Sequence, residues 1–433
     1  MVKQEHRFGW TMPGISKKVV KIAVISVLSI GVLYVLGLIY LPALLGAPFS
    51  SRSGGKLSVM DFVTWYEAGM LARSPERTQI YEPDVQLRYL NELIAPERSE
   101  VPFFIAYPPY FFSLMAPLSL LPLRTAYILW IIAWPLVLMA ALHFVLKKYA
   151  PRLDAADRAI FLLAVLFSQP LIISLRLGQT SSWLVTCICL FFHGLASKKD
   201  RLAGAALALS SIKPQYLLFL GLPAIAQRRW RLLASAVVAE MVLLVVAGLN
   251  VGWHNLIKYP SWLAYVETSP VTHLSISPKS MVSLRGLLSC LLPPEMTGII
   301  MAALLIAQVI YLCRVWSAPR LKTDLRWPMA LTLASATALS PHLHYHDLLI
   351  LSVAAALTIP SLSIFQAARL PAWPLRYWCL LLLYYPFVSW LCFMAASSIE
   401  IPLLAIMNTA LLLLAVSQVQ MMLGNKEPLE GLS

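Results

Sequence analysis

The sequence predicts an all-α polytopic membrane protein with about 12 membrane crossings. Hydrophobic residues make up 59% of its 433 residues and charged residues only 12%, whereas soluble globular proteins carry about 25% charged residues. The apolar residues form runs that reach the ~20 residues an α-helix needs to cross the hydrocarbon core. We therefore expect a single integral domain over 1–433, in the cell inner (plasma) membrane.

The first apolar run predicts a membrane helix at 19–45. It is too long for the core of a signal peptide, and no small-residue cleavage site follows it. A large extracytoplasmic loop is expected at 46–103, the remaining membrane bundle at 104–422 and a cytoplasmic tail at 423–433. The candidate spans within the bundle lie near 123–146, 159–176, 180–197, 202–226, 232–250, 297–316, 327–341, 348–366, 377–396 and 401–422.

The direction of each span follows from its basic flanks, because Lys and Arg gather on the cytoplasmic side. All basic clusters are cytoplasmic if 104–121 dips into the membrane without crossing and 202–226 crosses twice as a broken pair around Lys213-Pro214. A rival threading, in which both segments cross once, leaves two clusters outside. The four clusters are KKVVK at 17–21, KKYAPR at 147–152, KKD at 198–200 and QRRWR at 227–231.

The outer loop 251–296 is expected to form amphipathic helices at the membrane interface. Its segments WHNLIKYPSWLAYVE and SPKSMVSLRGLLSCLLP carry aromatic and apolar residues at helical spacing. Ordinary packing onto the bundle is the alternative explanation of the same pattern.

Several function classes are not indicated. The net charge of +14 comes from the clusters between spans, and no aromatic-interleaved basic stripe points to nucleic acid. The six cysteines lie in or beside apolar runs, which predicts neither a disulfide framework nor a zinc site. No glycine-rich loop of the nucleotide-binding types is present. We therefore expect no cofactor and no direct use of a nucleotide sugar at an inner site.

Polar groups in apolar surroundings are the candidate functional residues, because a charge at membrane depth is costly unless it is paired or hydrated. Asp61 opens the first outer loop, Gln179 follows Gly178 at a short outer turn, Lys213 interrupts an apolar run, and SPHLHYHD occupies 340–347. Under the first threading, all of them face one outer cavity.

Each candidate also has a structural interpretation. Asp61 can cap an amphipathic helix, Glu67 is expected on the solvated face of that helix, Lys213 can extend its ammonium to the headgroups, and Gln179 can satisfy the backbone of a turn.

The histidines at 342, 344 and 346 invite a metal site, because imidazole is a common zinc ligand. Alternate residues point the same way only on an extended strand, however, and the end of a span is more often helix or turn. We therefore expect no metal, and favour phosphate binding or a proton relay by His342, His344 and His346.

Five segments in fixed order resemble the polyprenyl-phosphate-sugar-dependent glycosyltransferases of family 87, which include the mycobacterial mannosyltransferase of phosphatidylinositol mannoside synthesis. The resemblance covers roughly residues 15 to 360 and implies the C-type glycosyltransferase fold. The segments are DFVTWYEAGMLARSPERTQIYEP, YPPYFFSLMAPLSLLP, LRLGQTSSWL, AGAALALSSIKPQYLLFL and SPHLHYHDLLIL.

The resemblance implies that Asp61 is the catalytic base. It also implies that Tyr107 with Pro108 and Pro109, Gln179, Lys213 and the histidine-bearing turn shape the site. The family often has Asn at the position of Ser181, so the resemblance implies that a sugar-hydroxyl contact is lost here.

The residues support the same chemistry. A transferase that uses a lipid-linked sugar phosphate needs a carboxylate to take the proton of the acceptor hydroxyl, and cations for the departing phosphate. Asp61 suits the first role; the predicted donor-binding residues are Lys213, His342, His344, His346, Arg285, Gln179, Tyr107 and Tyr66.

The predicted function is therefore transfer of a hexose, with mannose favoured, from a polyprenyl-phosphate sugar to a lipid or glycan acceptor at the extracytoplasmic face. A single base and no partner nucleophile favour direct displacement with inversion. The alternatives are a transporter or flippase of lipid-linked sugars, and a ligase that uses polyprenyl-diphosphate glycans.

Overall fold

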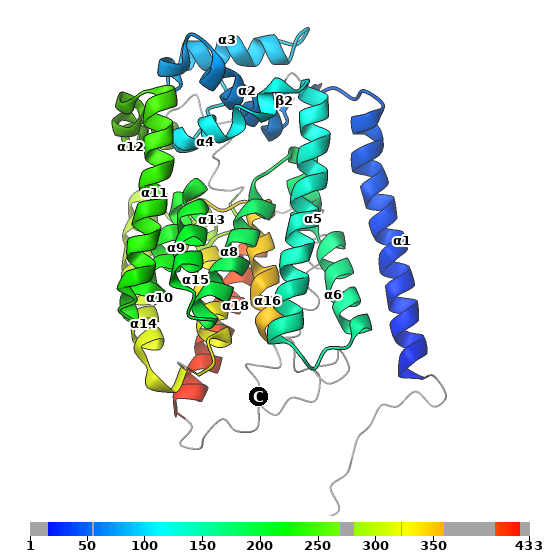
Figure 1. The fold of residues 1–433 in the computed structure, drawn as a ribbon, viewed down its shortest axis with the longest axis vertical. Helices are drawn as coiled ribbons and strands as arrows, with labels where there is room; N and C mark the ends of the chain where they lie inside the picture. The colour runs from blue at the N-terminus through cyan, green and yellow to red at the C-terminus, as the bar shows by residue number, and fades with distance from the viewer. Residues whose placement is uncertain (1–15, 54–55, 269–280, 322, 359–402, 425–433) are drawn as a thin grey trace, which may run out of the picture.

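The computed structural model describes residues 16–53, 56–268, 281–321, 323–358 and 403–424. They form a bundle of helices capped at one end by shorter helices and a small hairpin (Figure 1). The predominance of helix confirms the predicted class. The hairpin was not predicted: β1 (Ser50–Ser53) pairs antiparallel with β2 (Lys56–Val59), and this is the one sheet within the described residues.

Five helices are long and apolar enough to cross a membrane, and a sixth span arises if two helices bent by 51° are counted together. The chain is therefore a membrane protein, as predicted. The five are α1 (Lys17–Leu44), α5 (Leu123–Tyr149), α11 (Trp230–Val251), α14 (Pro294–Ser317) and α18 (Leu403–Gly424), and the bent pair is α6 (Ala155–Phe167) with α7 (Gln169–Leu177). The predicted span 377–396, the end of the span 348–366 and most of the tail 423–433 lie outside the described residues.

The remaining helices of the bundle are shorter. They are α8 (Ser181–Ala196), α9 (Asp200–Leu209), α10 (Leu217–Ala226), α15 (Arg326–Ala338) and α16 (Leu351–Thr358), together with the 3₁₀ segments η7 (Pro319–Leu321) and η8 (Tyr345–Ile350). The described part of the predicted span 348–366 consists of the end of η8 and the short helix α16.

The predicted break at Lys213-Pro214 is present, but its limbs are short. The 3₁₀ segments η3 (Ser210–Ile212) and η4 (Pro214–Tyr216) separate α9 from α10. Each of these helices has 10 residues and therefore reaches only about 15 Å, half the hydrocarbon core. The segment 202–226 thus enters the bundle and returns to the same end, where Arg229 pairs with Asp200, instead of making two full crossings.

The four basic clusters lie at one end of the bundle. Lys21 at the start of α1 pairs with Asp154 before α6 at 2.7 Å, and Lys148 at the end of α5 donates to Ser197 after α8 at 3.3 Å. Arg229, in the turn between α10 and α11, donates to the carbonyl of Leu195 at 2.9 Å. This arrangement agrees with the first threading and not with its rival, which separates the clusters.

The segment 104–121 forms only α4 (Pro109–Met115) and the 3₁₀ turn η2 (Leu118–Leu120), which are too short to cross. Helix α4 lies against α2 (Asp61–Arg73) and α11. The cap opposite the basic end consists of α2, α4 and η2 together with η1 (Arg77–Gln79) and α3 (Pro83–Leu93) (Figure 1).

Helices α12 (Trp253–Thr268) and α13 (Leu284–Leu291) occupy the predicted amphipathic loop. On its inner face, α12 donates from Trp262 Nε1 to the carbonyl of Ile105 at 3.0 Å. On its outer face, Trp253 and Ile257 are exposed, Ile257 to 82%. The helix therefore packs on the cap and also presents an apolar stripe directly after the span α11, as an interfacial helix does.

Close packing between α9 and α11 supports the broken segment. A Cβ added at Gly204 would lie 2.6 Å from the carbonyl oxygen of Leu232 and 2.7 Å from the backbone nitrogen of Ala236. Only a residue without a side chain allows this approach, which holds α9 against the long span α11.

We expect Gly204→Ala to lower the free energy of unfolding by about 1–3 kcal/mol, because backbone atoms cannot move aside as a side chain can. The measurement is thermal unfolding of the purified protein in detergent. Gly221→Ala on α10 is the matched control, since no atom lies within 4 Å of its added Cβ and Ala is the better helix former. Equal melting temperatures for Gly204→Ala and the wild type would contradict the close contact.

Candidate active site

The turn after α7 is held in one conformation by its neighbours. Helix α7 ends at Leu177 and is followed by Gly178, which has φ +72°; a Cβ on Gly178 would lie 2.6 Å from Cβ of Phe62. The indole of Trp65 donates to the carbonyl of Gly178 at 2.9 Å, and Trp130 donates to the carbonyl of Gln179 at 3.4 Å. These contacts fix the direction of the next three side chains.

Those three consecutive side chains, which we call the Gln-Thr-Ser turn (179–181), contact three different elements. Gln179 donates from its amide to the Asp61 carboxylate on α2. The hydroxyls of Thr180 and Tyr107 lie 3.0 Å apart. Ser181 donates to Asp347 at 3.3 Å. The turn therefore joins residues that are far apart in the sequence into one polar cluster.

A buried ion pair completes the cluster. Nζ of Lys213 lies 2.5 Å from Oδ1 of Asp347, and the two side chains are only 9% and 1% exposed. Lys213 stands between η3 and η4, where Pro214 prevents a continuous helix. The interpretation that Lys213 extends to the headgroups is therefore wrong, because the ammonium is buried and paired with Asp347.

Asp347 is the residue that sequence reasoning missed, since it was noted only as the neighbour of the histidines. The available signal was its opposite charge to Lys213 in similarly apolar surroundings, because charges buried in a protein are paired.

Asp61 is the first residue of α2 and not its N-cap, which is Met60 and makes no side-chain capping bond. Desolvation by the surrounding protein raises the pKa of Asp61 from 3.8 to about 6, against the lowering effects of the hydrogen bond from Gln179 and the charge of Lys213. A carboxylate with this pKa is ionised at neutral pH and more basic than an ordinary aspartate, as a general base requires.

Glu67 does not lie on a solvated face, so this prediction was wrong. Its side chain is fully buried, and neither carboxyl oxygen has a hydrogen-bond partner among the described residues. Burial raises the pKa of Glu67 well above 4.5. Helix α2 is packed on both faces within the cap, and this packing overrides its polar pattern.

The histidine rings lie side by side, contrary to the expected geometry. Ring centroids are 4.7 Å apart for His342 and His344, and 6.0 Å apart for His344 and His346. The chain is extended at His344, with φ −109° and ψ 171° before η8, so alternate side chains turn to one side. His346 Nε2 lies 3.7 Å from the Asp347 carboxylate, which places the rings beside the ion pair.

A model of glycosyltransferase family 87 matches residues 104–343, more than half of the chain. The chain belongs to glycosyltransferase family 87. No curated protein matches it. Membership makes the protein a glycosyltransferase, with a sugar donor and an acceptor. The match includes Tyr107, Gln179, Lys213, Arg285 and His342; Asp61 precedes it and Asp347 follows it, so the structure alone connects these two residues to the matched segment.

The two remaining predicted site residues of this family 87 glycosyltransferase, Arg285 and Tyr66, lie in different surroundings. Arg285 on α13 donates to the carbonyl of Pro341 at 2.6 Å, which brings it next to the histidine turn. Tyr66 instead donates to the carbonyl of Leu121 at 2.7 Å, on the side of α2 that packs against the end of η2. Its hydroxyl therefore stabilises the cap and does not join the contacts of Asp61.

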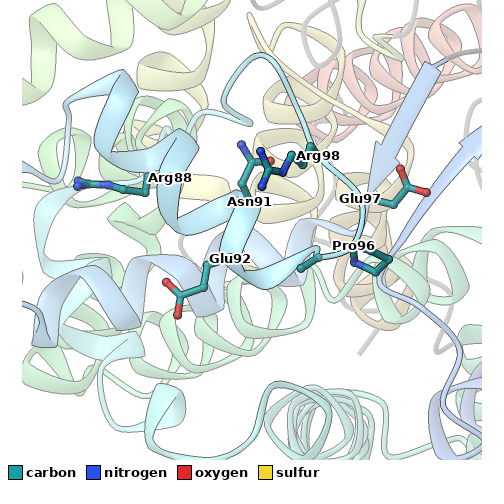
Figure 2. Close-up of a pocket in the computed structure, with 7 residues that line it drawn as sticks. Arg88, Asn91, Glu92, Pro96, Glu97 and Arg98 are labelled. Carbon is teal, nitrogen blue, oxygen red and sulfur yellow. The ribbon is translucent and has the colours of Figure 1, made fainter.

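A separate hollow of about 640 Å³ lies at the C-terminal end of α3. Figure 2 shows its charged side chains of both signs, and none of them belongs to the Asp61 cluster. Its lining residues are Arg88, Asn91, Glu92, Ala95, Pro96, Glu97 and Arg98.

We expect Asp347→Ala to destabilise the glycosyltransferase by about 3–5 kcal/mol, because it leaves the Lys213 ammonium buried without its counter-ion. The double variant Lys213→Met/Asp347→Leu removes both charges and should recover most of this loss. Thermal unfolding in detergent measures both effects. A double variant less stable than Asp347→Ala would show that the pair is not the dominant interaction of these residues.

Proposed function

We propose that this glycosyltransferase moves a hexose, with mannose favoured by the family resemblance, from a polyprenyl-phosphate sugar to a lipid or glycan acceptor at the extracytoplasmic face. The observation that carries the proposal is the hydrogen-bonded cluster in which the Gln-Thr-Ser turn joins Asp61 to the Lys213–Asp347 pair. It brings a basic carboxylate and a cation together inside one membrane bundle.

The position of the cluster supports an extracytoplasmic site. The turn at 179–181 is separated from the basic end by α8, whose 16 residues correspond to about 24 Å. Because basic clusters mark the cytoplasmic side, the cluster would lie towards the opposite face, where α2 of the cap contributes Asp61. A donor with its lipid tail in the bilayer can place its phosphate at this depth.

In the proposed reaction, Asp61 accepts the proton of the acceptor hydroxyl as that oxygen attacks the anomeric carbon. The bond from the anomeric carbon to the phosphate oxygen breaks, and the electron pair leaves with the polyprenyl phosphate. Attack opposite the leaving group inverts the configuration, so a β-linked donor gives an α-linked product. The Asp61 carboxylate is hydrogen-bonded by the amide of Gln179 and not by a second acid, which favours this single displacement.

Lys213, Arg285 and the histidine turn are proposed to stabilise the departing phosphate. Charge-assisted hydrogen bonds from such groups are stronger when negative charge accumulates in the transition state. Because Lys213 has three donor hydrogens, its ammonium can keep Asp347 while it donates to a phosphate oxygen.

The proposal is tested with purified protein, a panel of radiolabelled polyprenyl-phosphate sugars and membrane lipid extract. We expect label to move from one monophosphate donor to a lipid or glycan product. Transfer only from diphosphate-linked glycans would favour the ligase alternative. Movement of intact donor across a vesicle bilayer without any new glycosidic bond would favour a flippase.

Asp61→Asn should insert and fold normally but lose about 10²- to 10⁴-fold in transfer rate, because the amide keeps the shape of the side chain without a basic oxygen. Initial rates with the donor identified by the panel provide the measurement. Glu92→Gln, in the separate outer hollow, is the matched carboxyl-to-amide control and should keep wild-type rates. Rates near wild type in Asp61→Asn would remove this residue from the base role.

The transfer rate should fall as the pH drops below about 6, by roughly tenfold per pH unit. The sign follows from the raised pKa of Asp61, about 6: protonation occupies the oxygen that must accept the acceptor proton. The pH profile of kcat/KM for the acceptor measures the effect. An unperturbed aspartate would keep its rate down to about pH 4, and such a profile would contradict the proposed environment of the base.

A further inference from the structure

Glu240 is an acidic residue near the middle of the span α11, Trp230–Val251. Its neighbours Val237, Val238, Met241 and Val242 are exposed apolar residues on the outside of the bundle. A carboxylate at this depth is costly unless it has a partner, so an intramembrane acid is a candidate functional residue by default. The proposed reaction leaves Glu240 without a role.

Glu240 accepts the last of two consecutive hydrogen bonds. Ser211 Oγ donates to Glu240 Oε2 at 2.8 Å, and the Tyr110 hydroxyl lies 2.5 Å from the same Ser211 oxygen. Because serine has one hydroxyl hydrogen and it is directed at Glu240, Tyr110 is the donor to Ser211. The bonds therefore run in one direction, from Tyr110 through Ser211 to the carboxylate.

The hydrogen bonds of Tyr110 and Ser211 connect Glu240 to two parts of the proposed donor site. Ser211 belongs to η3, two residues before Lys213. Tyr110 lies in α4, one turn after Tyr107, whose hydroxyl contacts Thr180 of the Gln-Thr-Ser turn. The segment 107–110, which leads into α4, thus contacts the turn through Tyr107 and the broken segment through Tyr110.

The broken segment needs such a contact. Short 3₁₀ segments have weaker hydrogen-bond geometry than an α-helix, and Pro214 has no amide hydrogen to donate. A hydrogen bond to a carboxylate in an apolar environment is stronger than one to a neutral acceptor. A second link, from Asn250 on α11 to Ser113 on α4 at 3.0 Å, holds the same two helices together.

We propose that Glu240 is a positioning residue that acts through Ser211 and Tyr110 to hold Lys213 and Tyr107 in place for the lipid-linked sugar phosphate. The inference rests on the proposed function for the identity of the ligand. The links among Tyr110, Ser211 and Glu240 are independent of it.

The kinetic experiment compares Glu240→Leu, Glu240→Gln and wild type with the donor identified by the panel. Loss of the acceptor oxygen in Glu240→Leu should raise KM for the donor roughly ten- to a hundredfold, with KM for the acceptor unchanged. Glu240→Gln keeps an amide oxygen for Ser211 and should recover most of the donor affinity. Met241→Leu, on the exposed face of α11, is the matched control and should match wild type.

Two outcomes would overturn the proposal. One is an equal rise of both KM values in Glu240→Leu, as expected for general disruption of the fold. The other is failure of Glu240→Gln to recover donor affinity. Tyr110→Phe should reproduce the donor effect, and the double variant Glu240→Leu/Tyr110→Phe should be no worse than the poorer single variant, because the two hydrogen bonds act as a unit.

A stability measurement separates this inference from the proposed function. Melting temperatures of wild type, Glu240→Leu, Lys213→Met and the double variant form a cycle that requires no donor. If Glu240 positions Lys213, the two losses are not additive, even if the protein transfers no sugar from a polyprenyl phosphate. Additive losses would refute the link between Glu240 and Lys213 whatever the substrate.

Discussion

The polar cluster of this glycosyltransferase depends on one buried ion pair, Lys213–Asp347. An ammonium and a carboxylate inside an apolar bundle are stable only together and with further hydrogen bonds. The chain meets this requirement by interrupting a helix at Pro214 and by directing Ser181 at the Asp347 carboxylate. The break also explains why α9 and α10 are too short to cross: they bring Lys213 to the depth of the Gln-Thr-Ser turn.

Hydrogen bonds from two tryptophans fix the Gln-Thr-Ser turn and thereby position Asp61. Trp65 and Trp130 hold the backbone of Gly178 and Gln179, so the amide of Gln179 is directed at Asp61. Trp65 also packs against Tyr107, with ring centroids 4.4 Å apart. The proposed base, the tyrosine segment and the ion pair therefore cannot move independently. A change in the Gln-Thr-Ser turn would therefore alter the positions of both the proposed base, Asp61, and the Lys213–Asp347 pair.

The sequence was informative wherever a polar residue interrupts an apolar run. Asp61, Gln179 and Lys213 were selected as polar groups in apolar surroundings, and the structure brings them into one cluster. The break at Pro214 was predicted from the same interruption, and the basic end from the Lys and Arg clusters. The pattern could not reveal partners, because Asp347 and Glu240 meet Lys213 and Ser211 only through tertiary packing. The prediction for Glu67 was wrong for a different reason: a polar residue on a helix predicts exposure, yet both faces of α2 are packed within the cap. The hairpin at 50–59 was missed because its strands of four residues are too short for an alternating pattern.

The charge balance of the cluster limits how a phosphate group can bind in the proposed reaction. Lys213 and Asp347 already neutralise each other, and Asp61 adds a negative charge close enough for Lys213 to affect its pKa. A donor phosphate would therefore meet a site with no net positive charge from these three residues. In the proposed reaction the remaining cation would be Arg285, which contacts the carbonyl of Pro341 at the start of the histidine turn. Burial lowers the pKa of His346 well below 6.5, so the ring beside the Lys213–Asp347 pair is neutral at pH 7. In the proposed reaction this ring would therefore bind the departing phosphate as a neutral N–H donor, a role that does not involve a metal.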